Sequence, residues 1–337
     1  MTYKEIIEAA KDCMGFCKAC IVCNGKVCKN CMPGPGAKGI GDVAIRNYDK
    51  WREIRLNMDT ICSNEDVDAS FELFGKKFKY PIFAGPIGAV QLHYGDKYTE
   101  EEYNDIMLSS CAASGIAAFT GDGVNPNIMI SATNMIKKQN GIGIPTVKPW
   151  NIDVIKEKMK LITDANAFAV AMDVDAAGLP FLKNLTPKAG SKTIDELRKI
   201  KEISSVPFII KGIMTVNGAK KAVEAGADAI IVSNHGGRVL DQCASTAEVL
   251  PEIVDAVKGK IKILVDGGIR TGADILKALA IGADAVIIAR TFVIAAYGGG
   301  EEGVKSYIAQ LGSELEDAMI MCGVHSLKEI TRDIVRL

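Results

Sequence analysis

The sequence of 337 residues has almost no net charge, because 40 lysines and arginines offset 41 aspartates and glutamates. It contains no basic block and no basic segment interleaved with aromatic residues, so we expect no nucleic-acid partner. No apolar run approaches the roughly 18 residues of a membrane-spanning helix. The first eight residues mix charges and lack the apolar core of a signal peptide. We therefore expect a cytoplasmic protein without membrane contact.

Six of the ten cysteines lie close together, between residues 13 and 31. Two C-x2-C pairs around a turn can converge on one tetrahedral metal ion, and a run of cysteines at two-residue intervals is also similar to iron–sulfur ligation. The candidate ligands are Cys20, Cys23, Cys28 and Cys31. A zinc ion, an iron–sulfur cluster, a metal-free reduced hairpin and disulfides all remain open. The isolated cysteines, which we expect to be small buried hydrophobic residues, are Cys62, Cys111, Cys243 and Cys322.

The prolines and glycines at residues 33–36 exclude regular structure, and we expect them to end a cysteine-rich amino-terminal segment of residues 1–35. Residues 36–337 then form one unit. Hydrophobic residues make up 48% of the sequence, which is enough to build a large core. The first segment should begin with a short helix at 3–12, and the chain should end with one or two closing helices at 301–336.

From residue 80 onward, eight short apolar runs alternate with helical patterns. The runs are 81–84, 116–119, 144–147, 168–171, 208–210, 230–232, 263–265 and 286–288, and the helical patterns are 100–113, 128–138, 152–163, 193–203, 216–225, 246–257 and 271–281. Such alternation predicts a parallel sheet, and eight strands close into a barrel, so the expected fold class is α/β with a (β/α)8 TIM barrel. A doubly wound sheet is disfavoured, because no early glycine-rich turn is followed by an acidic residue.

One apolar run changes abruptly into a polar stretch. The run at 229–232 is followed by Ser233, Asn234, His235 and Arg238, with two glycines between the last two. Polar side chains at the carboxyl end of a barrel strand are typical of the active sites of this fold. The run at 208–210 ends similarly in Lys211, a charge that needs a partner when it is buried.

The stretch from Ser233 to Asp241 resembles the signature of the FMN-dependent 2-hydroxy-acid oxidase and dehydrogenase family, which includes glycolate and lactate oxidases. The resemblance implies that His235 is the general base, that Arg238 pairs with the substrate carboxylate and that Lys211 lies near the flavin N1 and C2 carbonyl. It also implies a homo-oligomer, a tetramer in this family. The expected reaction oxidises a small 2-hydroxy acid to the 2-oxo acid and passes the electrons to FMN N5.

The resemblance implies a set of FMN-binding residues, in which the loops after the seventh and eighth strands hold the phosphate. These residues are Pro86, Ile87, Gly88, Thr120, Lys211, Ser233, His235, Gly236, Asp266, Gly267, Gly268, Arg270, Ala289 and Arg290. It also places the cysteines near the flavin, which favours a redox-active iron–sulfur cluster over redox-inert zinc.

The sequence departs from the family on the substrate side. Met32 stands where the family has a tyrosine, and residues 173–183, after the fourth strand, contain no arginine. Lys148 or Lys183 could replace the missing cation. Two alternatives therefore stay open. One is another FMN enzyme on the same barrel, a reductase or an isomerase, and the other is a catalytically idle flavin or metal redox sensor.

Overall fold

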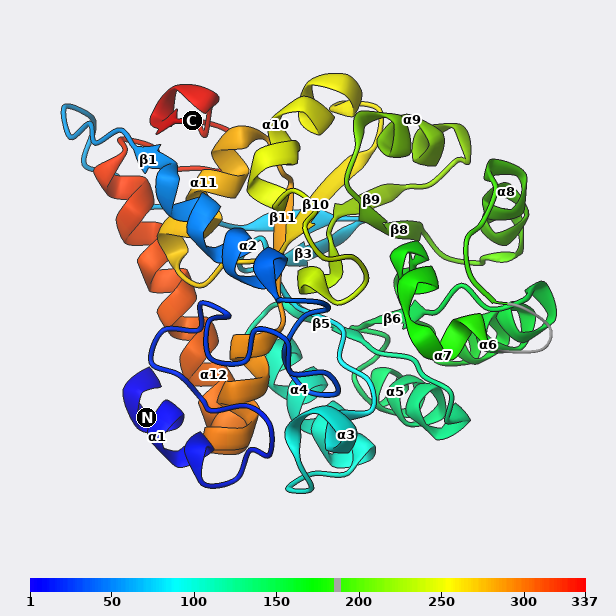
Figure 1. Cartoon of the computed structure of the whole chain (residues 1–337). Coiled ribbons are helices and arrows are strands. Elements are labelled where there is room, and N and C mark those ends of the chain that lie inside the picture. The colour runs from blue at the N-terminus through cyan, green and yellow to red at the C-terminus, as the bar shows by residue number, and fades with distance from the viewer. Residues whose placement is uncertain (185–188) are drawn as a thin grey trace.

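The computed structural model describes residues 1–184 and 189–337, and its centre is a closed barrel of eight parallel strands (Figure 1). The strands are β4 (Ile82–Ala84), β5 (Ala117–Thr120), β6 (Ile144–Val147), β7 (Val170–Asp173), β8 (Phe208–Ile213), β9 (Ala229–Val232), β10 (Lys262–Asp266) and β11 (Ala285–Ile288). Each strand pairs with the next along the chain, and β11 pairs with β4. The predicted (β/α)8 fold is confirmed.

Helices surround the barrel at nearly the predicted positions. They are α4 (Glu100–Ala113), α5 (Pro126–Lys138), α6 (Ile152–Asp164), α8 (Ile194–Ile203), α9 (Val216–Glu224), α10 (Thr246–Val257), α11 (Gly272–Ile281) and α12 (Arg290–Met321), with short α3 (Val90–Tyr94) and α7 (Pro180–Lys183) in the connections after β4 and β7. Threonine or serine starts many of them, and α4, α8, α10 and α11 each begin with a capping box that satisfies free backbone N–H groups. No helix in the described part of the chain is long and apolar enough to cross a membrane.

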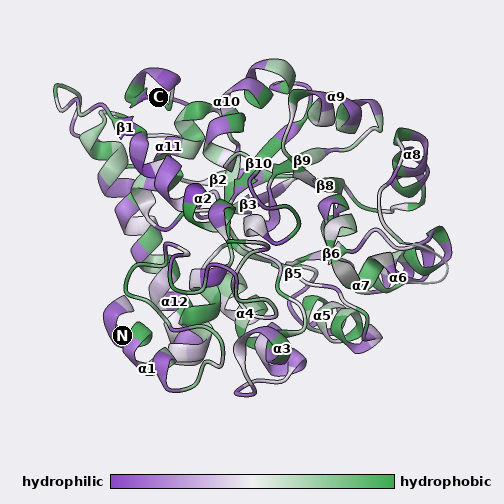
Figure 2. Ribbon diagram, in the orientation of Figure 1, coloured by the Kyte–Doolittle hydropathy of each residue, from purple (hydrophilic) through white to green (hydrophobic). Residues whose placement is uncertain are grey.

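Successive strand residues point alternately into the barrel and toward the helices, as the two-residue period of a strand requires. The inward cluster includes Phe83, Phe119, Ile144, Ala171, Ile209, Ile231, Leu264 and Ile287. The outward residues belong to a second, larger core under the helices, so the strands are apolar on both sides, as their colouring in Figure 2 shows. A hairpin of β2 (Phe71–Leu73) and β3 (Lys76–Phe78) adds Phe71, Leu73 and Phe78 to the inward cluster.

The inward row continues beyond the apolar residues at the carboxyl end of the barrel. Two residues after Ile144, Ala171, Ile209, Ile231 and Leu264 come Thr146, Asp173, Lys211, Ser233 and Asp266, all polar. The strand period therefore gathers the polar side chains from five neighbouring strands at one end of the barrel.

Two predicted boundaries were wrong. The strand predicted at 168–171 runs from Val170 to Asp173, and the last helix begins at Arg290 rather than at residue 301. Three glycines at 298–300 lie inside this helix, which continues through them with one non-helical residue, Gly300 (φ 56°, ψ −140°). The tail then adds β12 (Val335–Arg336), which pairs with β1 (Arg55–Leu56).

The amino-terminal segment packs on the barrel. Helix α1 (Tyr3–Lys11) lies along α12, and its residues Ile6, Ile7 and Ala10 are buried in the main core (Figure 1). Residues 12–41 contain no helix or strand, and they lead into α2 (Asp42–Glu53), at the mouth of the barrel. The domain boundary at residue 35 stays a prediction.

The isolated cysteines differ in their burial. Cys111 and Cys322 are buried, as predicted, but Cys62 is exposed and Cys243 is half-buried. None of the ten cysteines, all of which are in the described part of the chain, forms a disulfide.

Candidate active site

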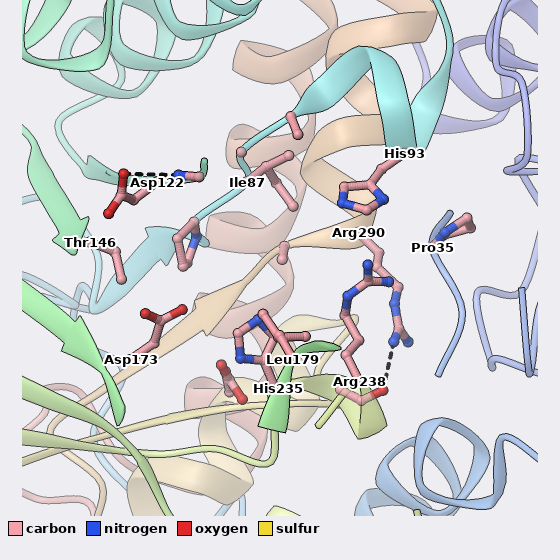
Figure 3. A pocket seen from close by; sticks show the side chains of 18 of the residues that line it. Pro35, Ile87, His93, Asp122, Thr146, Asp173, Leu179, His235, Arg238 and Arg290 are labelled. Carbon is pink, nitrogen blue, oxygen red and sulfur yellow. Dashed lines mark hydrogen bonds between the residues drawn. The ribbon is translucent and has the colours of Figure 1, made fainter. Parts of the chain in front are cut away.

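A cavity of about 620 Å³ opens at the carboxyl ends of the barrel strands. Its walls come from the ends of β4, β6, β7, β8, β10 and β11 and from residues 32–35 of the amino-terminal segment (Figure 3). This is the end of the barrel at which active sites of the fold occur. The cavity is large enough for a cofactor and a small substrate.

Lys211 is fully buried at the base of this cavity. Its Nζ donates to the hydroxyl of Ser233 (2.8 Å) and lies 3.6 Å from Oδ2 of Asp266 and 3.9 Å from Oδ2 of Asp175. Burial opposes the positive charge, but the carboxylates of Asp175 and Asp266 outweigh it and raise the pKa of Lys211. Lys211 is therefore a permanent cation inside the barrel.

His235 follows β9 and faces the same space. Its Nδ1 lies 3.1 Å from Oδ1 of Asp175, and its backbone N–H donates to the Ser233 hydroxyl. Burial and the Lys211 cation lower the pKa of His235, although Asp175 opposes this shift. His235 is thus neutral near pH 7, with Asp175 holding the ring and Nε2 left to accept a proton. Its backbone is left-handed (φ 56°), a strained conformation for a non-glycine residue and one often found at functional sites.

A bulge in β8 makes the contact between Asp175 and His235 possible. The register of β8 against β9 shifts between Lys211 and Ile213, and Gly212 lies in the bulge with φ 102°. A Cβ on Gly212 would lie 2.5 Å from the Cβ of Asp175. Only glycine leaves room there for the loop that carries Asp175.

Two arginines follow the seventh and eighth strands. Arg270 lies after the Asp266–Gly268 turn, and Arg290 is the first residue of α12. Both line the cavity, and Arg290 donates to the carbonyl of Gly236 (2.9 Å). Arginines combined with a helix start form a typical phosphate-binding site. Gly268 must stay a glycine, because its Cβ would lie 1.9 Å from the carbonyl oxygen of Asn47.

Several buried polar atoms around the cavity fit an oxygen- and nitrogen-rich ring such as a flavin. Among the described residues, Oγ1 of Thr120, Oγ1 of Thr146 and Oδ1 of Asp266 are buried without a hydrogen-bond partner. Unpaired buried polar atoms are costly and therefore uncommon, so their presence around a cavity indicates a ligand that pairs with them. Together with the two arginines, these atoms fit a flavin ring with a phosphate group.

Most of the predicted flavin residues line this one cavity. Those that do are Pro86, Ile87, Gly88, Lys211, His235, Gly236, Asp266, Gly267, Gly268, Arg270, Ala289 and Arg290. Thr120 and Ser233 lie just behind the wall, where Ser233 connects Lys211 to Asp266 and Thr120 keeps its unpaired hydroxyl. The structure thus brings the predicted set together, while their individual roles stay predictions.

Arg238 also lines the cavity, but part of its guanidinium is already occupied. Its NH1 donates to the carbonyls of Gly34 and Gly36 and so holds the amino-terminal segment over the barrel mouth. Its other nitrogen atoms face the cavity side shown in Figure 3, close to Arg290 and His93. Arg238 therefore holds the amino-terminal segment and also lines the cavity, where we predicted that it pairs with the substrate carboxylate.

The missing family residues are replaced by a lysine and by apolar side chains. Lys148, at the end of β6, is buried in the cavity wall, where its Nζ pairs with Asp173. Met32, Leu179 and Phe181 line the cavity as well. The side chain of Lys183, the other predicted substitute, lies outside those described. The position of Lys148 makes it the available replacement cation.

Sequence reasoning missed three residues of this site. Asp175 holds His235; Asp122 accepts from Trp150 Nε1 (2.6 Å) and from Lys158 Nζ (2.7 Å) and fixes the loop after β6. The ring of His93 faces the cavity, and burial together with nearby Arg238 lowers its pKa to about 4. Asp122 and Asp175 could have been predicted, because acidic residues follow the second and fourth apolar runs closely in the sequence.

The cysteines gather around a separate, smaller cavity beside the first. Cys17, Cys20, Cys23 and Cys28 line it, and Cys31, predicted as a ligand, does not. The Cys31 thiol instead lies near the carbonyl of Pro33 (3.7 Å). The grouping Cys20, Cys23, Cys28 and Cys31 stays a prediction, and Cys17 lines this cavity together with the first three of these cysteines.

Comparisons with known proteins agree with this arrangement. The sequence model of the FMN-dependent dehydrogenase family matches residues 35–181 and 172–337. A peroxisomal (S)-2-hydroxyacid oxidase of Arabidopsis thaliana is 49% identical over 321 residues, with 86% of this chain and 87% of that protein covered. An L-lactate dehydrogenase of Pseudomonas entomophila is 51% identical over 138 residues, and this match covers 41% of the chain but only 36% of that protein. The chain thus spans about a third of the length of that relative.

Solved structures show the same fold. A mandelate oxidase variant superposes with a TM-score of 0.81 at 24% identity, covering 100% of this chain and 98% of the other. A flavocytochrome b2 variant superposes with a TM-score of 0.77 at 24% identity, covering 88% and 78%. At this identity the superpositions show only that the fold is shared. The family match, in contrast, extends over almost all of the chain after the cysteine-rich segment, so this chain belongs to the FMN-dependent dehydrogenase family.

Proposed function

We propose that this protein oxidises a 2-hydroxy acid to the corresponding 2-oxo acid with FMN as the electron acceptor. The observation that carries the proposal is the contact between His235 and Asp175 beside the buried Lys211. A neutral histidine held by a carboxylate is a general base, and a permanent cation next to it stabilises negative charge that develops during the reaction.

FMN, when bound, supplies the two-electron oxidising centre. Thr120, Thr146 and Lys211 would hold its ring, and Arg270 and Arg290 its phosphate. His235 would take the proton that leaves the substrate, and Asp175 keeps the proton-accepting nitrogen turned toward the cavity. The burial of these groups excludes water and strengthens their electrostatic interactions.

The substrate carboxylate would meet Arg238 and Lys148. Both are cations of the cavity wall. Each already has a partner, because Arg238 donates to the carbonyls of Gly34 and Gly36. Lys148 pairs with Asp173. The apolar side chains of Met32, Leu179 and Phe181 would face the substituent on the substrate's second carbon. This lining supports a 2-hydroxy acid with an apolar side chain.

Anaerobic reduction of the bound flavin tests the proposal. We expect glycolate, lactate and longer 2-hydroxy acids to bleach the visible flavin absorption, with faster bleaching as the apolar side chain grows. The matched 2-hydroxy amides, which lack the carboxylate charge, should react much more slowly. If no 2-hydroxy acid bleaches a flavin that dithionite reduces normally, the proposed reaction is wrong.

The substrate side of the cavity departs from the family pattern, and this departure supports a second candidate function. Residues 174–179, in the loop after β7, contain no arginine, and Lys148 is engaged with Asp173. Another FMN enzyme, a reductase or an isomerase, would fit a cavity whose carboxylate partners are weakened. Turnover without net oxidation of the substrate would identify it. A catalytically idle redox sensor would show neither turnover nor flavin bleaching.

The cytoplasmic location and a homo-oligomeric state, a tetramer by resemblance, are further parts of this proposal. Sedimentation of the purified protein and fractionation of the source cells test them.

A further inference from the structure

The smaller cavity is not used by the proposed reaction, although it contains four of the ten cysteines. Cys17, Cys20, Cys23 and Cys28 line it together with Lys18, Pro35 and Arg290. We propose that these four cysteines bind a [4Fe–4S] cluster. The residues, their spacing, the charge around them and their place beside the flavin cavity support this assignment.

The spacing of the four cysteines matches cluster ligation. Cys17, Cys20 and Cys23 follow one another with two residues between them, as in the C-x2-C-x2-C run of bacterial ferredoxins. Cys28 supplies the fourth thiolate from the other side of the turn at Asn24 and Gly25. The fold, rather than the spacing alone, selects these four and leaves out Cys13 and Cys31.

The arrangement does not suit a single zinc ion. A tetrahedral zinc with Zn–S bonds of about 2.3 Å brings its thiolate sulfurs to about 3.8 Å from one another. Among the described residues, the only group of three or more ligand atoms within 4.8 Å of one another is Asp173, Asp175 and His235, and it includes no cysteine. The carboxylates of that group are already paired with Lys148 and Lys211. No three of these described thiols lie within 4.8 Å of one another, so the cysteines are not arranged around a single zinc ion. A polynuclear cluster accepts thiolates that lie farther apart.

The charge around the cavity favours the same occupant. Four thiolates around an oxidised cluster carry a net charge of about −2, and Lys18 and Arg290 line the cavity with positive charge. The cavity itself is only about 20 Å³, so the loop has to widen to admit a cluster.

The site lies directly beside the flavin cavity. Pro35 and Arg290 line both cavities, and Nε of Arg270, from the expected phosphate loop, donates to the carbonyl of Cys23 (2.9 Å). If the proposed function holds, each 2-hydroxy acid oxidised releases two electrons and two protons. The cluster carries one electron at a time, so two passages to an external one-electron carrier protein complete a turnover. The exposed side chains of Ile21, Val22 and Val27 show that the loop is accessible to such a carrier.

Metal content and spectra test the site without reference to any substrate. The full-length protein is purified anaerobically, or reconstituted with ferrous iron and sulfide, and then analysed for iron, sulfide and zinc. We expect about four iron and four sulfide per chain and, after dithionite, an electron paramagnetic resonance signal of a reduced cluster. Zinc in stoichiometric amount without iron, or no metal at all, overturns the proposal.

Matched serine variants test the ligand set. Cys17→Ser, Cys20→Ser and Cys28→Ser should each lose most of the iron, whereas Cys13→Ser and Cys31→Ser should keep it. Because Cys17 is buried, circular dichroism and flavin content show whether each variant folds, and Cys20→Ser, at a half-buried position, gives the same test with less risk of misfolding. Iron lost from Cys31→Ser but kept in Cys17→Ser overturns the assignment. Because metal binding needs no substrate, failure of the proposed oxidation leaves this result unaffected.

Discussion

At the scale of single residues, the chemistry depends on pairs that the chain brings together from distant positions. His235 is held by Asp175, 60 positions earlier, and Lys211 is balanced by Asp175 and Asp266. Each pair joins the carboxyl ends of strands that are adjacent in the barrel or separated by one strand, so the closed barrel brings these charged groups into contact. Removing one member leaves its partner buried and uncompensated.

His235→Ala should separate cofactor binding from catalysis. The variant should still bind FMN, because most of the expected flavin contacts come from other residues, but reduction of the flavin by a 2-hydroxy acid should slow about 100-fold or more. Stopped-flow absorbance measures the rate. His325→Ala changes a histidine outside the cavity, beside Glu329, and should leave the rate unchanged. Near-normal reduction in the His235 variant would mean that another group is the base.

The pH dependence of the reaction should follow His235. Only the neutral ring accepts a proton, so kcat/KM should fall as pH drops through its pKa. Burial and Lys211 lower this pKa below the ordinary 6.5, which places the acidic limb below pH 6.5. Asp175→Asn removes the carboxylate that raises the pKa, so it should move the limb to still lower pH and also reduce the maximal rate. A limb that moves upward would contradict the assignment.

Lys148→Met should weaken substrate binding more than it slows the chemical step. The variant loses a cation of the cavity wall, so KM for a 2-hydroxy acid should rise roughly 10-fold or more while kcat changes less. It also leaves Asp173 unpaired, and the double variant Lys148→Met with Asp173→Asn controls for this effect. Steady-state kinetics with the acid and its amide distinguish the cases. An equal loss for both substrates would show that Lys148 does not contact the carboxylate.

At the scale of elements, the sequence predicted the barrel well because each strand is a short apolar run between amphipathic helices. All eight strands and the helices α4, α5, α6, α8, α9, α10 and α11 lie within a few residues of their predicted positions. The β2–β3 hairpin and the β1–β12 pair were not predicted, because strands of two or three residues leave almost no periodic signal. The closing helix was predicted from residue 301, whereas α12 begins at Arg290 and passes through three consecutive glycines, which disfavour helix.

Close packing of α1 against α12 explains why residue 298 is a glycine although it lies inside a helix. A Cβ at Gly298 would lie 2.0 Å from the carbonyl oxygen of Ile6, so α1 packs on α12 only across a glycine. Gly298→Ala should therefore destabilise the protein by about 1–3 kcal/mol through overpacking. In Gly299→Ala the new Cβ lies 3.2 Å from the sulfur of the flexible Met1 side chain and at an ordinary 3.6 Å from Ile6 Cγ1, so the variant should be neutral or stabilising by up to about 1 kcal/mol, as alanine favours helix. Thermal unfolding of both variants measures the difference, and equal midpoints would contradict the close contact.

At the scale of the whole molecule, the site is assembled from nearly the full length of the chain. Residues 32–35 cover the cavity, the ends of β4 to β11 form its walls, and Arg290 begins the last long helix. The positions of the cavity residues at strand ends could be predicted from the motifs. The position of Cys17 beside Cys20, Cys23 and Cys28 and the contact of Arg238 with Gly34 could not, because irregular segments follow no periodic rule.

A cofactor that contacts so many strands should stabilise the entire fold. A ligand that binds only the native state adds about 2.7 kcal/mol to the free energy of unfolding at a concentration of 100 times its Kd. We expect FMN to raise the thermal midpoint of the flavin-free protein strongly and riboflavin to raise it much less, because riboflavin lacks the phosphate that Arg270 and Arg290 would bind. FAD should also be inferior, since the phosphate site suits one terminal phosphate. In Arg290→Ala the advantage of FMN over riboflavin should shrink, while the flavin-free variant controls for the lost contact with Gly236. Equal stabilisation by FMN and riboflavin would show that the loops after β10 and β11 do not bind a phosphate.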